Sequence, residues 1–244
     1  MASSLRRKAR AGLGVLAELY IPEHLKTYQP TRRFTVAVSE GGGIETWEAQ
    51  IHEEKIGDLT LATGKLIATD PAYGRFPEDI TPFTRTVPPG TYSVVLGMVD
   101  EYTSRHYASN VYALICFSDN PIIHWELALC PEQNADELEG MQYFGFGVDS
   151  GTGCFLDEGL KYYLAQEEVQ RLMGDVMTGN GDITLTMERG ARMVVFIAGM
   201  GDGCYPCYWG LDTQDQPVCL LADFQILRSL EELLSMGQVS EPRV

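Results

Sequence analysis

Apolar residues in this chain form short segments in which hydrophobic and polar positions tend to alternate. The alternation is clearest over residues 34–38 and 47–51. A period of two predicts β-strands, because successive side chains of a strand point to opposite faces. Apolar content and flanking turn residues predict further strands over residues 91–96, 142–148, 183–187, 193–198 and 218–222.

Two pairs of apolar segments are separated by residues that favour tight turns. Glycine supplies positive φ, and Asp, Asn and Pro favour turn positions. Each pair therefore predicts a β-hairpin. The pairs are residues 59–62 and 65–69 around Thr63-Gly64, and residues 111–117 and 122–129 around Ser118-Asp119-Asn120-Pro121.

Apolar residues show helical spacing at two places, within residues 166–177 and close to the C terminus. The two apolar faces consist of Val169, Leu172, Met173 and Val176, and of Leu227, Leu230, Leu233 and Leu234. About ten strands and two helices predict a mostly β fold with some α (α+β), either an antiparallel β-sandwich or a curved sheet with about two helices packed on it. No linker interrupts residues 20–236, so we expect a basic N-terminal arm over residues 1–20 and a single β-rich domain over residues 21–244.

The charge balance narrows the classes of partner. The chain has 34 acidic and 18 basic residues, which gives a formal net charge of −16. Because such a surface repels phosphate backbones and anionic membranes, we expect no nucleic acid and no membrane partner. A basic protein partner or a small polar ligand suits it better. The apolar stretch after the basic residues 6–10 is too short for an export signal, so the six cysteines predict a cytoplasmic protein with reduced thiols.

Aspartates recur at the ends of apolar strands, beside or close to Gly or Pro. They are Asp70, Asp149, Asp202, Asp212 and Asp223. Each can be explained as a turn residue. If these strand ends meet at one edge of a sheet, their carboxylates and the amides of the glycine loops converge on one space. Such a space suits a hard cation or a polar ligand.

Two glycine-rich segments, residues 145–153 and 199–210, also place aromatic residues next to these acids. The aromatic side chains either fill the core where the backbone comes close, or form the wall of a concave site. The second alternative predicts a binding edge composed of Asp149, Ser150, Gly151, Thr152, Gly153, Asp202, Gly203, Tyr205, Tyr208, Trp209 and Asp212.

Three long motifs identify a resemblance to a known family. They are Phe144-Gly145-Phe146-Gly147-Val148-Asp149-Ser150-Gly151-Thr152-Gly153-Cys154-Phe155-Leu156-Asp157, Gly201-Asp202-Gly203-Cys204-Tyr205-Pro206-Cys207-Tyr208-Trp209-Gly210-Leu211-Asp212 and Cys219-Leu220-Leu221-Ala222-Asp223-Phe224. With shorter matches over residues 63–71, 88–92 and 117–127, the chain resembles domain of unknown function 4241 over roughly residues 55–225. The resemblance implies a bacterial, cytoplasmic, single-domain protein of a family without an established activity, and it carries over no catalytic residues.

Two function classes follow from these residues. In the favoured one, the protein is a non-catalytic binding domain, of an accessory or immunity type, that recognises a small polar ligand or a partner protein. It then needs no cofactor apart from a possible divalent cation. In the alternative, Asp149 and Asp202, together with Asp212 or Asp70, hold a divalent metal that activates water for hydrolysis. Glu126, beside Trp125 in an expected strand, is then the candidate general base.

Three other chemistries remain open at this stage. Asp149-Ser150-Gly151-Thr152 matches an aspartic-protease signature, which needs a second carboxylate about 3 Å away. Cys204 and Cys207 have the spacing of a redox or zinc pair. Cys154 or Ser150 is a candidate nucleophile, with His106 or His124 as its base.

Overall fold

The computed structural model of the chain describes residues 25, 33–40, 43–99, 109–139, 142–165, 167, 183–186 and 192–227. The N-terminal arm expected over residues 1–20 lies outside these residues. So do the two expected helices, apart from Glu167 and Leu227 at their beginnings.

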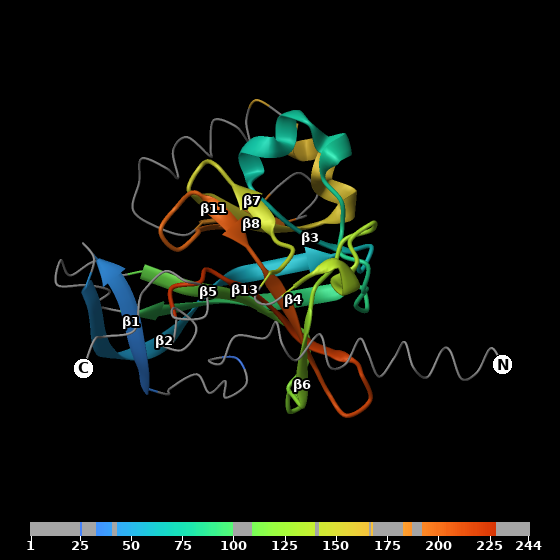
Figure 1. The fold of residues 1–244 in the computed structure, drawn as a ribbon. Coiled ribbons are helices and arrows are strands. Elements are labelled where there is room, and N and C mark those ends of the chain that lie inside the picture. Colours follow the sequence, from blue (N-terminus) through green and yellow to red (C-terminus); the bar gives the residue numbers. More distant parts are fainter. Residues whose placement is uncertain are drawn as a thin grey trace.

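Most of the described chain belongs to antiparallel sheets (Figure 1). The largest sheet has seven strands in the order β1-β2-β4-β5-β13-β12-β6. These strands are β1 (Arg33–Glu40), β2 (Gly43–Leu61), β4 (Gly90–Val99), β5 (Ser109–Cys116), β13 (Pro217–Asp223), β12 (Cys207–Leu211) and β6 (His124–Leu127). The second sheet has four strands in the order β3-β8-β10-β9, which are β3 (Leu66–Thr69), β8 (Thr152–Asp157), β10 (Arg192–Ile197) and β9 (Ile183–Thr186).

The remaining elements are short. A two-stranded ladder joins β11 (Gly203–Tyr205) to β7 (Phe146–Val148). The 3-10 helices are η1 (Pro71–Arg75), η2 (Pro77–Asp79), η3 (Ala135–Glu137) and η4 (Glu158–Ala165). The predicted mostly β, antiparallel fold is therefore confirmed, whereas the described residues contain fewer helices than the expected two. No helix among the described residues has the length and apolar character needed to span a bilayer.

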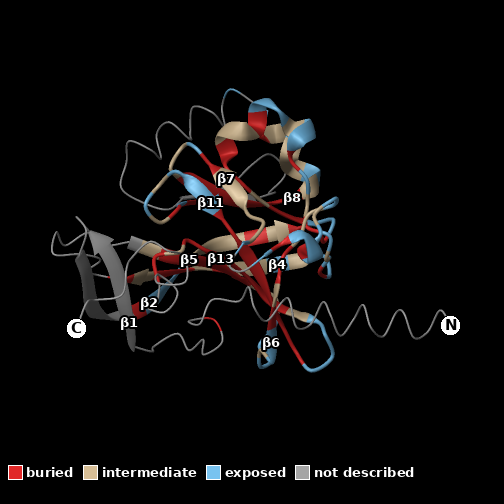
Figure 2. Cartoon of the chain, in the orientation of Figure 1, coloured by how far each residue is buried: buried red, intermediate tan, exposed pale blue. Residues whose placement is uncertain are grey.

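The seven-stranded and four-stranded sheets lie in separate layers with an apolar core between them (Figures 1 and 2). In β5, Ala113 and Ile115 face this core, whereas Tyr112 and Leu114 pack on the opposite face of the sheet. Strands that are buried on both faces need apolar residues at every position. This explains why β5 and β13 are continuous apolar runs in the sequence. The core between the sheets includes Leu59, Leu61, Val94, Leu96, Ala113, Ile115, Phe155, Val194, Phe196, Trp209, Leu211, Leu220 and Ala222.

The 3-10 helices η1 and η4 cover the outer face of the four-stranded sheet (Figure 1). Ile67, Cys154 and Val195 on that face form a small apolar cluster with Ile80 and Leu164. The two helices approach closely at Gly74, where a Cβ atom would lie 2.3 Å from Cβ of Leu164. This cover fixes η1 at the edge of the sheet where β3 ends.

Both predicted hairpins are wrong. β2 and β3 lie in different sheets, and β13 and β12 lie between β5 and β6. At the first position the chain crosses between the two sheets at Gly64, which has φ +72°. Glycine is required there, because a Cβ atom would lie 2.1 Å from the carbonyl oxygen of Val87. The buried carboxylate of Asp157 fixes the crossing by accepting hydrogen bonds from the amide and hydroxyl of Thr63, at 2.9 and 2.8 Å.

Candidate functional site

The ladder of β7 and β11 brings two of the predicted aspartates to adjacent strand ends. Val148 pairs with Gly203, and the next position beyond the ladder is Asp149 on one strand and Asp202 on the other. Both side chains are exposed. The loops continue side by side, since a Cβ atom on Gly151 would lie 3.9 Å from Cα of Gly201. The sheet edge expected from the sequence therefore exists for this pair of acids.

Asp70 lies beneath this edge and is completely buried. Its Oδ2 accepts hydrogen bonds from the amides of Asp149 and Ser150, at 2.8 and 2.7 Å. Its Oδ1 accepts from the Ser150 hydroxyl and the Ala72 amide, both at 2.7 Å. Four donors therefore satisfy one buried carboxylate, as burial of a charged group requires. Asp70 joins the start of η1 to the loop that carries Asp149.

Tyr73 of η1 connects the same loop to the interior. Its hydroxyl donates a hydrogen bond of 2.7 Å to Oδ2 of Asp149. This bond, burial and then the negative charges of Asp149, Asp70 and Asp202 raise the pKa of Tyr73 to about 12. Three carboxylates therefore lie close enough to act on one hydroxyl group. Tyr73 lies against Gly147, where a Cβ atom would be 3.3 Å from the hydroxyl oxygen.

Tyr73 also lines a pocket of about 520 Å³. Its volume lies in the range typical of small-molecule sites. Phe76 is one of its apolar lining residues and is itself 65% exposed. The lining comes from η1, β3, β7, β12 and the segments around them, and consists of Ala68, Thr69, Tyr73, Phe76, Asp79, Ile80, Thr81, Phe83, Ala128, Cys130, Pro131, Gln133, Gly145, Phe146, Gly147 and Cys207.

Two other predicted aspartates are turn residues at opposite ends of the β12–β13 ladder. Asp212 accepts hydrogen bonds from the amides of Gln214 and Gln216, at 2.8 and 3.0 Å, and from the Asn120 side chain at 2.8 Å. The amide of Gln216, followed by that of Gln214, lowers the pKa of Asp212. Asp223 is buried and accepts from the amide of Gln225 at 2.9 Å. The structure thus brings Asp70, Asp149 and Asp202 together and places these two elsewhere.

The aromatic residues of the second glycine-rich segment lie inside the protein. Trp209 and Tyr208 are each 1% exposed, on opposite faces of β12. Tyr205 is buried as well, and its hydroxyl donates to the carbonyls of Ala198 and Gly201. These side chains fill the core behind the edge. Of the neighbouring predicted residues, Thr152 and Gly153 are also buried, whereas Gly203 is exposed.

The thiol groups lie in surroundings that disfavour the thiolate. Cys154 is buried, and burial raises its pKa well above the ordinary value. Cys204 and Cys207 are free thiols on β11 and β12 rather than at the start of a helix, and burial raises the pKa of both. The Ser150 hydroxyl is bound to Asp70. His106 lies outside the described residues.

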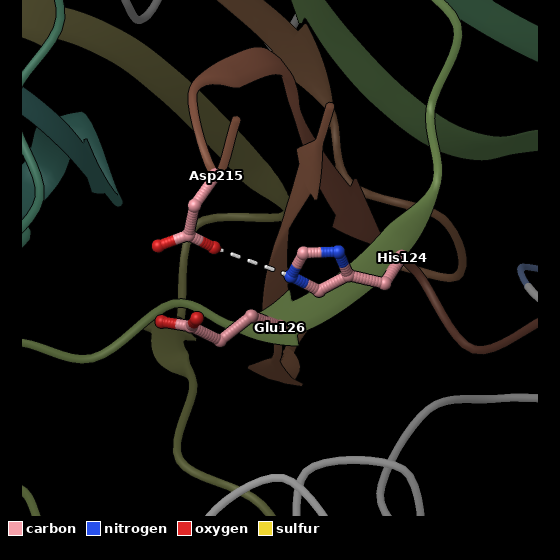
Figure 3. A group of neighbouring side chains, drawn as sticks. All are labelled: His124, Glu126 and Asp215. Atoms are coloured by element: carbon pink, nitrogen blue, oxygen red, sulfur yellow. Dashed lines mark ion pairs between the residues drawn. The ribbon is translucent and has the colours of Figure 1, made fainter. Parts of the chain in front are cut away.

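Glu126 belongs to a separate polar cluster. Its Oε2 accepts a hydrogen bond of 2.9 Å from Nη2 of Arg85. His124 and Asp215 lie beside it (Figure 3). Sequence reasoning missed Arg85, Asp215 and Tyr73, because their roles depend on segments that meet only in the folded chain. The only sequence signal near Tyr73 is Asp70-Pro71, an N-cap followed by proline, which indicates the start of a helical turn.

The pocket and the acidic pair both lie in the part of the chain that matches a known family. The sequence model described as "Protein of unknown function (DUF4241)" matches residues 59–222. No curated protein and no solved structure matches the chain. Because the family match covers more than half of the sequence, this protein belongs to the DUF4241 family.

Proposed function

We propose that this protein is a non-catalytic binding domain that holds a small organic cation, one with an apolar body and an amine or guanidinium group. The apolar body occupies the pocket, and the cation lies at Asp149 and Asp202. A lysine or arginine side chain of a basic partner protein offers the same chemistry. The observation that carries the proposal is the position of Tyr73, which lines the pocket and also donates to Asp149.

The charges near the pocket favour a cation. Asp149 and Asp202 are exposed at the end of the β7–β11 ladder, whose strand β7 contributes Phe146 and Gly147 to the lining, and Asp79 is part of the lining itself. None of the described residues that line the pocket is Lys or Arg. The chain as a whole carries a net charge of −16, which increases the rate of encounter with cations. An anionic ligand of the same shape would meet repulsion at this edge.

The hydrogen bonds of the edge favour binding over turnover. Asp70 is fully engaged with four donors, so it acts as a support for the loop. Ser150 donates to that support, and burial raises the pKa of the Cys130 and Cys207 thiols that line the pocket. A site fixed in this way is preorganised, which lowers the entropy cost of holding a ligand.

Three probes with similar apolar bodies test the proposal: phenethylamine, phenethyl alcohol and phenylacetate. A ligand that binds only the folded state raises the unfolding midpoint. We expect phenethylamine to raise the midpoint most, phenethyl alcohol less, and phenylacetate not at all. Asp149→Asn should remove the difference between the amine and the alcohol. The exposed residue Asp119 provides the matched control, since Asp119→Asn should leave all three responses unchanged.

The second candidate function is metal-dependent hydrolysis, with Asp149 and Asp202 as metal ligands. The observation that favours it is their position at adjacent ends of one ladder. In this case the protein hydrolyses a generic phosphoester in the presence of Mg²⁺ or Mn²⁺, and Asp149→Asn abolishes the activity. That result would overturn the non-catalytic proposal.

A further inference from the structure

His124, Glu126 and Asp215 form a group of possible metal ligands outside the pocket (Figure 3). One ligand atom from each side chain lies within 4.8 Å of the other two. Nε2 of His124 is 3.4 Å from Oδ1 of Asp215. The group combines one imidazole with two carboxylates and lies at the surface, so an ion can reach it from solvent.

The strand period and one turn explain why these side chains meet. His124 and Glu126 are two residues apart on β6, so they share a face, and Trp125 between them points into the opposite core. β6 pairs with β12 in register, with His124 opposite Leu211. The turn after β12 returns Asp215 to this face in a left-handed conformation with φ +61°.

Arg85 fixes both carboxylates from the side. Its Nη2 lies 2.9 Å from Oε2 of Glu126, and its Nη1 lies 3.6 Å from Oδ2 of Asp215. Nη1 also donates to the backbone carbonyl of Asp215 at 3.0 Å. Each carboxylate therefore gives one oxygen to Arg85 and keeps the other. Carboxylates that bind metals are commonly oriented by outer hydrogen bonds of this kind.

We propose that His124, Glu126 and Asp215 bind a zinc-class divalent ion through Nε2, Oε1 and Oδ1. Zinc lies about 2.1 Å from imidazole nitrogen and carboxylate oxygen, so two ligands at a tetrahedral angle are about 3.4 Å apart. This is the separation of Nε2 and Oδ1. It is longer than the roughly 2.7–2.9 Å of a charge-assisted hydrogen bond.

The ion pairs of His124, Glu126 and Asp215 contribute little to the stability of the folded protein, so stability does not explain why these side chains are grouped. His124, Asp215 and Glu126 have exposed side-chain fractions of 49%, 55% and 42%. Ion pairs with such exposure contribute about 0–1 kcal/mol. Three protein ligands also leave a coordination position open, as in zinc sites that bind water or a substrate group. The site does not depend on the ligand proposed for the pocket.

Calorimetric titration of ZnCl₂ into the full chain, after treatment with a chelator, tests this site. We expect one zinc ion per chain. His124→Ala and Asp215→Asn should each raise the zinc Kd at least tenfold. Cys204→Ser and Asp119→Asn are the matched controls, because they remove an exposed thiol and an exposed carboxylate outside the cluster, and both should bind zinc like the original protein.

Measured without zinc, His124→Ala and Asp215→Asn must first show unfolding midpoints close to that of the original protein. We expect this because both substituted side chains are about half exposed. If His124→Ala fails to fold, Asp215→Asn alone decides the result. Absence of zinc binding by the original protein would overturn the proposal. So would a Kd that changes with Cys204→Ser or Asp119→Asn but not with Asp215→Asn.

Discussion

Two turns in this protein have the same plan and different surroundings. In the loop after β7, backbone amides donate to the buried Asp70, which belongs to the segment after β3, and the exposed Asp149 lies above it. In the turn between β12 and β13, the buried Asp212 accepts backbone amides, and the exposed Asp215 lies above it. At each turn one aspartate holds the backbone, from another segment in the first case and from within the turn in the second, while the exposed aspartate is available for contacts with other groups.

The surroundings decide what the exposed carboxylate does. Asp149 has another acid, Asp202, at the adjacent strand end, and a pocket is lined by its hydrogen-bond donor Tyr73. Asp215 has the basic groups of Arg85 and His124 as neighbours. The first turn therefore suits an organic cation, and the second suits a metal ion held by mixed ligands. Residue type alone does not distinguish them.

The largest expected effect is that of removing a buried support. Asp70→Ala leaves the amides of Ala72, Asp149 and Ser150 without their acceptor inside the protein. Unsatisfied buried donors of this kind cost about 1–3 kcal/mol each, so we expect the free energy of unfolding to fall by about 3 kcal/mol or more. Urea denaturation measures it. A loss below about 1 kcal/mol would mean that Asp70 does not support the loop.

The contribution of Asp212, in the turn between β12 and β13, to the free energy of unfolding should depend on pH. Its hydrogen bonds lower the pKa of Asp212, so the ionised form stabilises the folded state above the unfolded pKa of about 4. Relative to Asp212→Asn, the original protein should be more stable at neutral pH. This advantage should disappear as the pH falls below about 4. Denaturant unfolding of both proteins at neutral pH and at a pH below about 4 checks this. A difference in the free energy of unfolding that grows in acid would contradict the hydrogen bonds described.

Tyr73 should contribute a smaller amount. Tyr73→Phe removes the donor to Asp149, and we expect a loss of about 1 kcal/mol at neutral pH. Because the pKa of Tyr73 is raised from 10.0 to about 12, its contribution is complete below pH 10.0 and is lost as the pH rises to about 12. NMR of ring-labelled tyrosine should lose one signal that titrates near 12 in this variant. If every late-titrating signal remains, the assignment is wrong.

Phe76 should affect binding more than stability. Its side chain lines the pocket and is 65% exposed. Phe76→Ala should therefore change the free energy of unfolding by less than about 0.5 kcal/mol. The substitution should raise the Kd of phenethylamine and of phenethyl alcohol alike, by about fivefold, because both probes lose the same apolar contact. Calorimetric titration of the two probes measures the ratio. A selective loss of the amine would place the cation in the pocket instead of at its edge.

The sequence could predict the strands better than their partners. Alternation and apolar runs identify the regions of β1, β2, β4 and β13, because these patterns are local. The turn residues at 118–121 are also recognisable, but the chain there leaves β5 and returns three positions further along the sheet, with β13 and β12 in between. Nothing in a turn specifies which strand fills the space beside it, since that depends on burial of both faces across the whole sheet.

The candidate site was predictable to a similar degree. Asp149 and Asp202 could be recognised as strand-end acids, and they meet because β7 pairs with β11. The burial of Asp70 could not be foreseen, since it depends on two amides some eighty residues away in the chain. The two interpretations of the aromatic residues were equally open from the sequence. Burial of Tyr208 and Trp209 in the core favours the first.

The most direct test of the binding proposal is a calorimetric titration of phenethylamine into the original protein and into the double variant Asp149→Asn/Asp202→Asn. We predict that the double variant binds the amine at least tenfold more weakly, about 1.4 kcal/mol, while both proteins bind phenethyl alcohol equally. Equal amine affinity for the two proteins, or no binding by the original protein, would contradict the proposal that this acidic edge recognises a cation.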